Sequence, residues 1–122
     1  MIHVKRIYEA PSDEDGFRVL VDRLWPRGVS KERAAIDVWL KQVAPSAGLR
    51  TWFSHDPSKF QEFFGLYCDE LAQNPATTGL IKLTKQHKNI TLLYAAKDPI
   101  INHARVLLNF LQDKINGSRP LG

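Results

Sequence analysis

The chain has 122 residues, of which 43% are hydrophobic and 25% are charged, so its composition is that of a globular domain rather than a disordered chain. Seventeen Lys and Arg residues against thirteen Asp and Glu residues give a net charge of +4. The basic residues are scattered, which disfavours a dedicated nucleic-acid-binding protein. A single cysteine, Cys68, excludes an internal disulfide. The absence of a signal peptide and of any apolar run of ~20 residues predicts a cytoplasmic protein with no membrane partner.

The first third of the chain predicts two strands followed by a short helix. Residues 2–8 alternate loosely, as a half-buried or edge strand does, and residues 17–24 form a strand apolar enough to be covered on both faces. Turn-forming residues at 10–16 join them as a hairpin or a wide loop. Ser30 predicts a helical turn that ends near residue 35, with a short strand at 36–40; one helix over 30–43 is the competing interpretation.

The rest of the chain predicts four helices and one central strand. Ser46 is the expected cap of a short helix, and Asp56-Pro57 begins a longer helix that ends at Asn74-Pro75. The apolar stripe of the longer helix is predicted to consist of Phe60, Phe63, Phe64, Tyr67 and Leu71. A further helix begins at Thr77 or Thr78, and residues 90–96 form a strand buried on both faces. Asp98-Pro99 begins the final helix, whose predicted buried stripe is Ala104, Leu107, Leu108, Leu111 and Ile115.

This order of elements predicts a small α/β sandwich. We expect a single domain over residues 1–117, a mostly parallel central sheet of about four strands flanked by helices, and a loose tail at 118–122. Ligands of such sheets bind beyond the carboxyl ends of the strands. Two polar loops follow predicted strands, at residues 22–28 and 96–103, and they are the expected site.

The first of these loops contains the candidate anion-binding groups. Arg23 and Arg27 can form a fork for a phosphate or carboxylate, because a guanidinium group binds such groups bidentately. The structural alternative is that one of them pairs with Asp22 or another buried acid and only holds the loop. Trp25 is expected to anchor the loop or to form the apolar wall of a pocket, and Gly28 permits backbone conformations closed to other residues.

The second loop supplies candidate proton-transfer groups. Lys97 can add charge, and Asp98 is a helix cap in preference to a general base, although both roles are open. Asn102 is a candidate ligand-binding residue, and His103 is the best candidate to transfer a proton. Arg50 is a further ligand-binding candidate from the short helix. The histidines lack paired metal-ligand spacing, and no phosphate-binding glycine loop occurs, so no metal or cofactor is predicted.

These motifs together resemble the YeaO-like branch of the bacterial family called domain of unknown function 488. The resemblance covers nearly the whole chain. The matching motifs are residues 17–28, Trp39-Leu40-Lys41 with Ala44-Pro45-Ser46, Leu49-Arg50 with Trp52-Phe53, His55-Asp56-Pro57, and residues 93–98 with Asn102-His103-Ala104. The resemblance implies a small α/β protein and assigns no reaction.

The sequence departs from the family pattern at two places. Members of the branch carry a small hydroxyl residue and an acid where this sequence has Ala47-Gly48, so any role of that acid is lost here. The wider family also includes members with a Cys-His pair after the last strand. The matching Asn102-His103 offers no cysteine nucleophile.

Three functional hypotheses follow. The first is a small-molecule or anion-binding protein, with or without enzyme activity, in which Arg23 clamps the anion, Lys97 assists and His103 transfers a proton. The second is a nucleic-acid or protein-binding regulatory module. It would use the basic surface formed by Arg27, Lys31, Arg33, Lys41 and Arg50. The third is a structural protein without a catalytic site.

Overall fold

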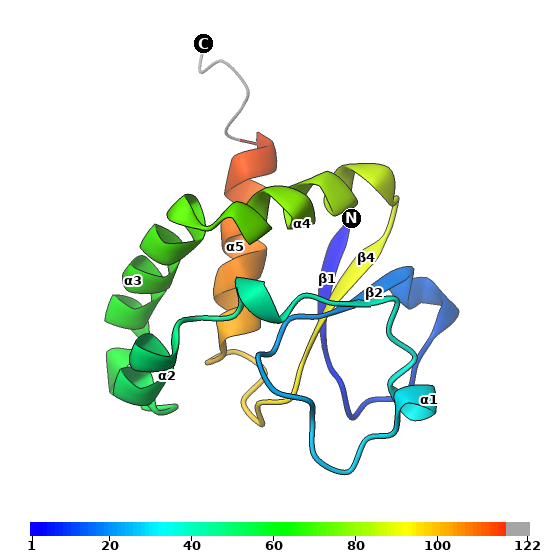
Figure 1. Cartoon of the computed structure of the whole chain (residues 1–122), viewed down its shortest axis with the longest axis horizontal. Coiled ribbons are helices and arrows are strands. Elements are labelled where there is room, and N and C mark those ends of the chain that lie inside the picture. The colour runs from blue at the N-terminus through cyan, green and yellow to red at the C-terminus, as the bar shows by residue number, and fades with distance from the viewer. Residues whose placement is uncertain (117–122) are drawn as a thin grey trace.

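The computed structural model describes residues 1–116 and contains a four-stranded, fully parallel sheet (Figure 1). Its strands are β1 (Ile2–Arg6), β2 (Phe17–Leu20), β3 (Val38–Trp39) and β4 (Ile90–Tyr94), in the order β1-β4-β2-β3. The predicted α/β class with a mostly parallel sheet is confirmed. The tail predicted at 118–122 lies outside the described residues.

Five α-helices are present in residues 1–116. They are α1 (Lys31–Ala34), α2 (Ala47–Phe53), α3 (Phe60–Gln73), α4 (Pro75–Gln86) and α5 (His103–Asn116), and 3-10 turns lie at Asp13–Asp15, Lys41–Val43 and Pro57–Lys59. None of these helices combines the length and apolar character needed to cross a bilayer.

The two faces of the sheet are covered unequally. Helices α2 to α5 pack on one face and enclose the larger core, which includes Val19 and Leu92. The opposite face carries a smaller cluster with Leu20 and Leu93, covered by α1 and loop residues such as Trp25. Consecutive residues of β2 and β4 therefore enter different cores, as the alternation of side chains along a strand requires. All five residues of β4 are buried, which confirms the predicted central strand.

The hairpin predicted between the first two strands is wrong, because β4 lies between β1 and β2. Residues 10–16 form the wide loop instead. Its last residue, Gly16, has φ 65°, and a Cβ there would lie 2.2 Å from the carbonyl oxygen of Asn89. Only glycine allows the chain to enter β2 so close to the segment before β4. The competing helix over 30–43 is also wrong, since α1 ends at Ala34 and Val38 pairs with Val19 of β2.

Three helices begin at residues other than those predicted. Helix α3 begins at Phe60, because Asp56-Pro57 begins a separate 3-10 turn over Pro57–Lys59. Helix α4 begins at Pro75 rather than at Thr77 or Thr78, because Asn74 Oδ1 accepts a hydrogen bond from the Ala76 amide at 3.0 Å. Helix α5 begins at His103 and not after Asp98-Pro99.

Hydrogen bonds explain the later start of α5. Asp98 Oδ1 accepts from the amides of Ile100 and Ile101 and closes a separate turn, whereas Asn102 Oδ1 caps the helix through the Arg105 amide at 3.0 Å. The buried stripe of α5 also stops earlier than predicted, because Ile115 is 38% exposed.

Candidate functional site

The carboxyl ends of β1, β2 and β4 open onto a cavity of about 960 Å³. Both predicted loops line it, together with Arg6 at the end of β1, Tyr8 shortly after it, and residues 50–51 and 53–55 at and just beyond the end of α2. The rule that ligand sites lie beyond the carboxyl ends of parallel strands therefore places the two loops correctly around one hollow. Arg6 and Tyr8 were missed in the sequence, although their position at the carboxyl end of the predicted strand 2–8 could have indicated them.

Arg23 and Arg50 are the unusual cations of this cavity. Both side chains are partly buried, and the Nε atom of each is enclosed without a hydrogen-bond partner. Within residues 1–116, neither guanidinium group forms an ion pair or a hydrogen bond with the protein. Buried polar groups are almost always paired, so two unpaired guanidinium groups in one cavity need an explanation.

Another buried arginine in the same chain shows the usual arrangement. Arg18 forms an ion pair with Asp15, and its Nε and Nη2 atoms donate to the carbonyl oxygens of Ala35 at 3.0 Å and Ala34 at 2.8 Å. Arg18 thus braces the loop before β2 against α1. Arg23 and Arg50 brace nothing in this way, although both are held in the wall of a hollow.

Asp22 does not pair with either arginine of its loop, contrary to the structural alternative. Its Oδ2 accepts from the Ala95 amide at 2.9 Å, which ties the β2 loop to the end of β4. His103 Nε2 lies 3.1 Å from both the Val21 carbonyl oxygen and Asp22 Oδ1. Because both neighbours are acceptors, Nε2 carries the proton. Its N–H is directed to Val21, since Asp22 Oδ1 has a close contact but no hydrogen bond.

The Asp22–Gly28 loop is fixed from inside. Trp25 Nε1 donates to the Val29 carbonyl oxygen at 2.7 Å, and the indole makes an edge contact with Trp39 at 5.5 Å between ring centroids. Gly28 has φ 73°, a value that favours glycine. Trp25 therefore serves both as a loop anchor and as a wall of the cavity, which were the two predicted alternatives.

The other predicted site residues also line the cavity, at different depths. Arg27 and Lys97 are exposed at its edge, and Asn102 is 1% exposed, with its amide nitrogen donating to the Asp98 carbonyl oxygen at 2.8 Å. Asp98 is exposed, and the backbone N–H groups of Ile101 and Ile100 lower the pKa of its carboxyl. This carboxylate is committed to a turn. Any contact of these four residues with a ligand stays a prediction.

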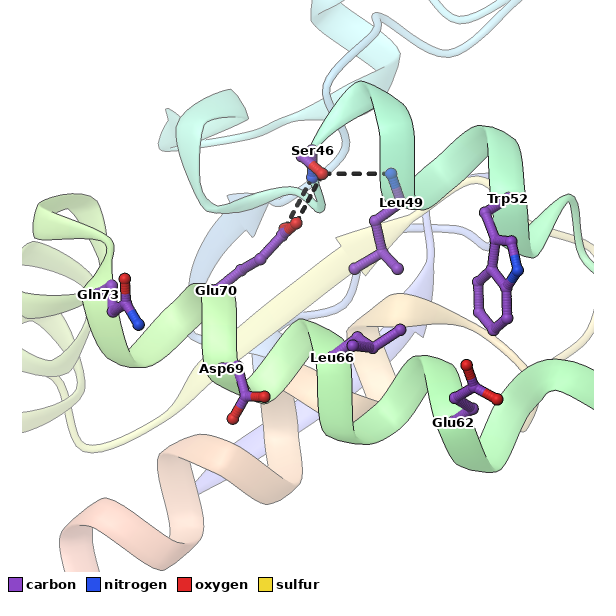
Figure 2. A pocket seen from close by; sticks show the side chains of 8 residues that line it. All are labelled: Ser46, Leu49, Trp52, Glu62, Leu66, Asp69, Glu70 and Gln73. Carbon is purple, nitrogen blue, oxygen red and sulfur yellow. Dashed lines mark hydrogen bonds between the residues drawn. The ribbon is translucent and has the colours of Figure 1, made fainter.

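A second hollow lies between α2 and α3 and has the opposite character (Figure 2). It measures about 530 Å³, and its apolar floor includes Leu66 and Trp52. Glu62, Asp69 and Glu70 stand along it, and Glu70 binds the Ser46 hydroxyl at 2.6 Å. Carboxylates repel anions, so the chain separates an acidic groove from the cationic cavity.

Comparison with known proteins gives a family and no activity. Residues 1–120 match the family described as the inactive DUF488-N3 subclade. The uncharacterized protein YeaO of Escherichia coli strain K12 is 40% identical over 111 residues, which cover 91% of this chain and 96% of YeaO. The uncharacterized protein Rv3073c of Mycobacterium tuberculosis strain H37Rv is 40% identical over 113 residues, 93% of this chain and 95% of its own length. No solved structure matches the chain. With matches over nearly its whole length, the chain belongs to the DUF488 family, in the subclade described as inactive DUF488-N3.

Proposed function

We propose that the protein binds a small molecule with a phosphate or carboxylate group in the cavity at the carboxyl ends of β1, β2 and β4. The observation that carries this proposal is the pair Arg23 and Arg50, whose guanidinium groups have no partner among residues 1–116. A bound oxyanion would accept hydrogen bonds from both. Hydrogen bonds that involve a charged group contribute about 1.5–3 kcal/mol each, which is enough for useful affinity.

The neighbouring charges support an anion at this place. Arg27 and Lys97 stand at the edge of the cavity and would attract an anion before it reaches Arg23 and Arg50. Asp22 and Asp98 are the two acids that line the cavity and could oppose binding. Backbone N–H groups hold both carboxylates, because Asp22 Oδ2 accepts from the Ala95 amide and Asp98 Oδ1 accepts from the Ile100 and Ile101 amides.

Binding without turnover is the form of this function that the residues favour. The family description uses the word inactive. Asn102 stands where some members of the wider family resemble one another in having a cysteine, and an amide is not a nucleophile. Asn102 is also occupied at both ends of its side chain, by the Arg105 amide and by the Asp98 carbonyl oxygen. The lone cysteine further supports the cytoplasm as the place of action.

Thermal unfolding with increasing inorganic phosphate tests the proposal. In the wild type, phosphate at a hundred times its Kd should raise Tm by roughly 10 °C. The Arg23→Ala and Arg50→Ala variants should lose most of this rise. Arg33→Ala removes the same charge from an exposed position on α1 and should keep it. Equal phosphate-induced rises in all four proteins would contradict the proposal.

A further inference from the structure

The cavity is much larger than an inorganic anion and has a second chemical character at its mouth. Its volume of about 960 Å³ is at the upper end of the 300–1,000 Å³ typical of small-molecule sites. Leu24, Trp25 and Pro26 directly follow Arg23 in its wall, and Leu24 is 70% exposed. An anion on Arg23 would leave most of this apolar wall uncovered. The ligand must therefore extend beyond its anionic group.

We infer that the ligand is a phosphate monoester that carries a flat aromatic ring, the chemistry of a nucleoside monophosphate. This inference rests on the proposed function and assigns the phosphate to Arg23 and Arg50 and the ring to Trp25. Arg23 and Trp25 are two residues apart, and two residues of extended chain span at most about 7 Å. A pentose bridges a phosphate and a base over a distance of this order.

The indole of Trp25 is already held in place for such a contact. Its Nε1 bond to the Val29 carbonyl oxygen and its edge contact with Trp39 restrict the ring, so little side-chain entropy is lost on binding. Trp39 Nε1 in turn donates to the Asp22 carbonyl oxygen at 2.7 Å. One chain of contacts therefore fixes the aromatic wall relative to the residue that precedes Arg23.

The mouth of the cavity contains a second preorganised stack. The Arg6 guanidinium lies 4.5 Å from the centre of the Tyr8 ring, and the Tyr8 hydroxyl donates to the Arg27 carbonyl oxygen at 3.0 Å. Arg6 Nε is held by the carbonyl oxygens of Ala95 and Ala96. Stacking on aromatic and guanidinium planes accepts any nucleobase, because every base presents a flat face. Stacking at the mouth of the cavity therefore indicates an aromatic ring on the ligand but does not select one nucleobase.

Isothermal titration with four ligands tests this inference: inorganic phosphate, ribose 5-phosphate, adenosine 5′-monophosphate and adenosine. Adenosine 5′-monophosphate should bind on the order of ten times more tightly than ribose 5-phosphate, since one stacked base contributes about that much. In Trp25→Leu this ratio should fall to about one. The ratio is the readout rather than either affinity alone, because Leu also removes the Nε1 bond that anchors the loop of Arg23. Trp25→Phe should retain most of the ratio.

Trp52→Leu is the matched control, because Trp52 lies in the acidic groove between α2 and α3 (Figure 2). It should leave both affinities unchanged. A 5′-phosphorylated trinucleotide distinguishes two sources of the same chemistry. If it binds more tightly than adenosine 5′-monophosphate, the natural ligand is the 5′ end of a nucleic-acid chain. If it binds equally or more weakly, the natural ligand is the free nucleotide.

The possible failures are separable. If ribose 5-phosphate and phosphate bind but adenosine 5′-monophosphate binds no more tightly, the aromatic ring is refuted and the anion site stands. If none of the phosphates binds, the phosphate form of the proposed function fails as well. Even if Trp25→Leu does not fold, the ratio of the affinities of the wild type for adenosine 5′-monophosphate and ribose 5-phosphate tests whether an aromatic ring is bound.

Discussion

Replacing Arg23 by Met should make the protein more stable when no anion is present. Arg23 Nε is enclosed without a hydrogen-bond partner in the part of the chain that the structure describes, and an unsatisfied buried donor costs about 1–3 kcal/mol. Methionine keeps an unbranched apolar stem in the same space and has no donor. Part of the gain is lost with the solvation of the outer guanidinium nitrogens, so we expect a net gain of about 1 kcal/mol in the free energy of unfolding.

The assay is thermal and urea unfolding in a buffer free of phosphate, sulfate and carboxylates. For a chain of 122 residues, about 1 kcal/mol corresponds to a rise in Tm of roughly 4 °C. Arg33→Met is the control, because it removes one positive charge from the same net charge of +4 at an exposed position. It should change Tm by less than about 2 °C.

Saturating phosphate should reverse the order, so that the wild type becomes more stable than Arg23→Met. This crossing is the signature of a site that sacrifices stability for binding. A lower Tm for Arg23→Met than for Arg33→Met in the anion-free buffer would show that Arg23 braces the fold. The reasoning from unpaired guanidinium groups would then be wrong.

Three further predictions concern the fold that supports the cavity. Tyr67→Phe should lower the free energy of unfolding by about 1–2 kcal/mol, because the buried Tyr67 hydroxyl donates to the Val43 carbonyl oxygen and no water can replace it. An unchanged midpoint in urea unfolding would contradict this. Gly16→Ala should lower the free energy of unfolding by about 1–3 kcal/mol in the same assay, since φ is 65° and the new Cβ would meet the Asn89 carbonyl. Gly28→Ala should lower it by less, because there is open space around its Cβ. Asp98 has a lowered pKa, so its contribution to stability is complete above its ordinary value of 3.8 and is lost as the pH falls through the lower folded value. The stability difference between wild type and Asp98→Asn should therefore shrink between about pH 5 and pH 2, and a constant difference would refute the assignment.

Local sequence patterns predicted the parts of this fold that local physics determines. The apolar run of β4 indicated a strand buried on both faces, and Ser46 caps α2 as expected, by accepting from the Leu49 amide. The two polar loops after β2 and β4 were also located correctly, because the carboxyl ends of parallel strands meet at one edge. The position of the cavity in the fold could therefore be predicted from the sequence.

The strand order and the partners inside the cavity were not predictable in the same way. Nothing in residues 10–16 indicates that β4 will enter between β1 and β2, since that pairing joins residues more than 70 positions apart. The same holds for Asp22, whose partners Ala95 and His103 come from the far end of the chain. A sequence shows which groups can pair. Only the fold shows that Arg23 is left without a partner among residues 1–116.

The departure from the family pattern at Ala47-Gly48 has a structural meaning that can be tested. Both residues are exposed in the first turn of α2, and neither lines the cavity, so an acid at position 48 would point to solvent rather than to Arg50. A Cβ on Gly48 meets no atom within 4 Å. Gly48→Glu should therefore raise the free energy of unfolding by about 1 kcal/mol, through helix propensity and the favourable interaction of a carboxylate with the helix N-terminus.

Gly48→Gln separates these two effects, because it changes propensity without adding charge. We expect a smaller gain for Gln in urea unfolding and the same phosphate affinity in both variants and the wild type. A loss of phosphate affinity in Gly48→Glu alone would mean that the carboxylate reaches the cavity. The acid found elsewhere in the family would then belong to the ligand site, and its absence here would be a gain of anion binding rather than a change in helix stability.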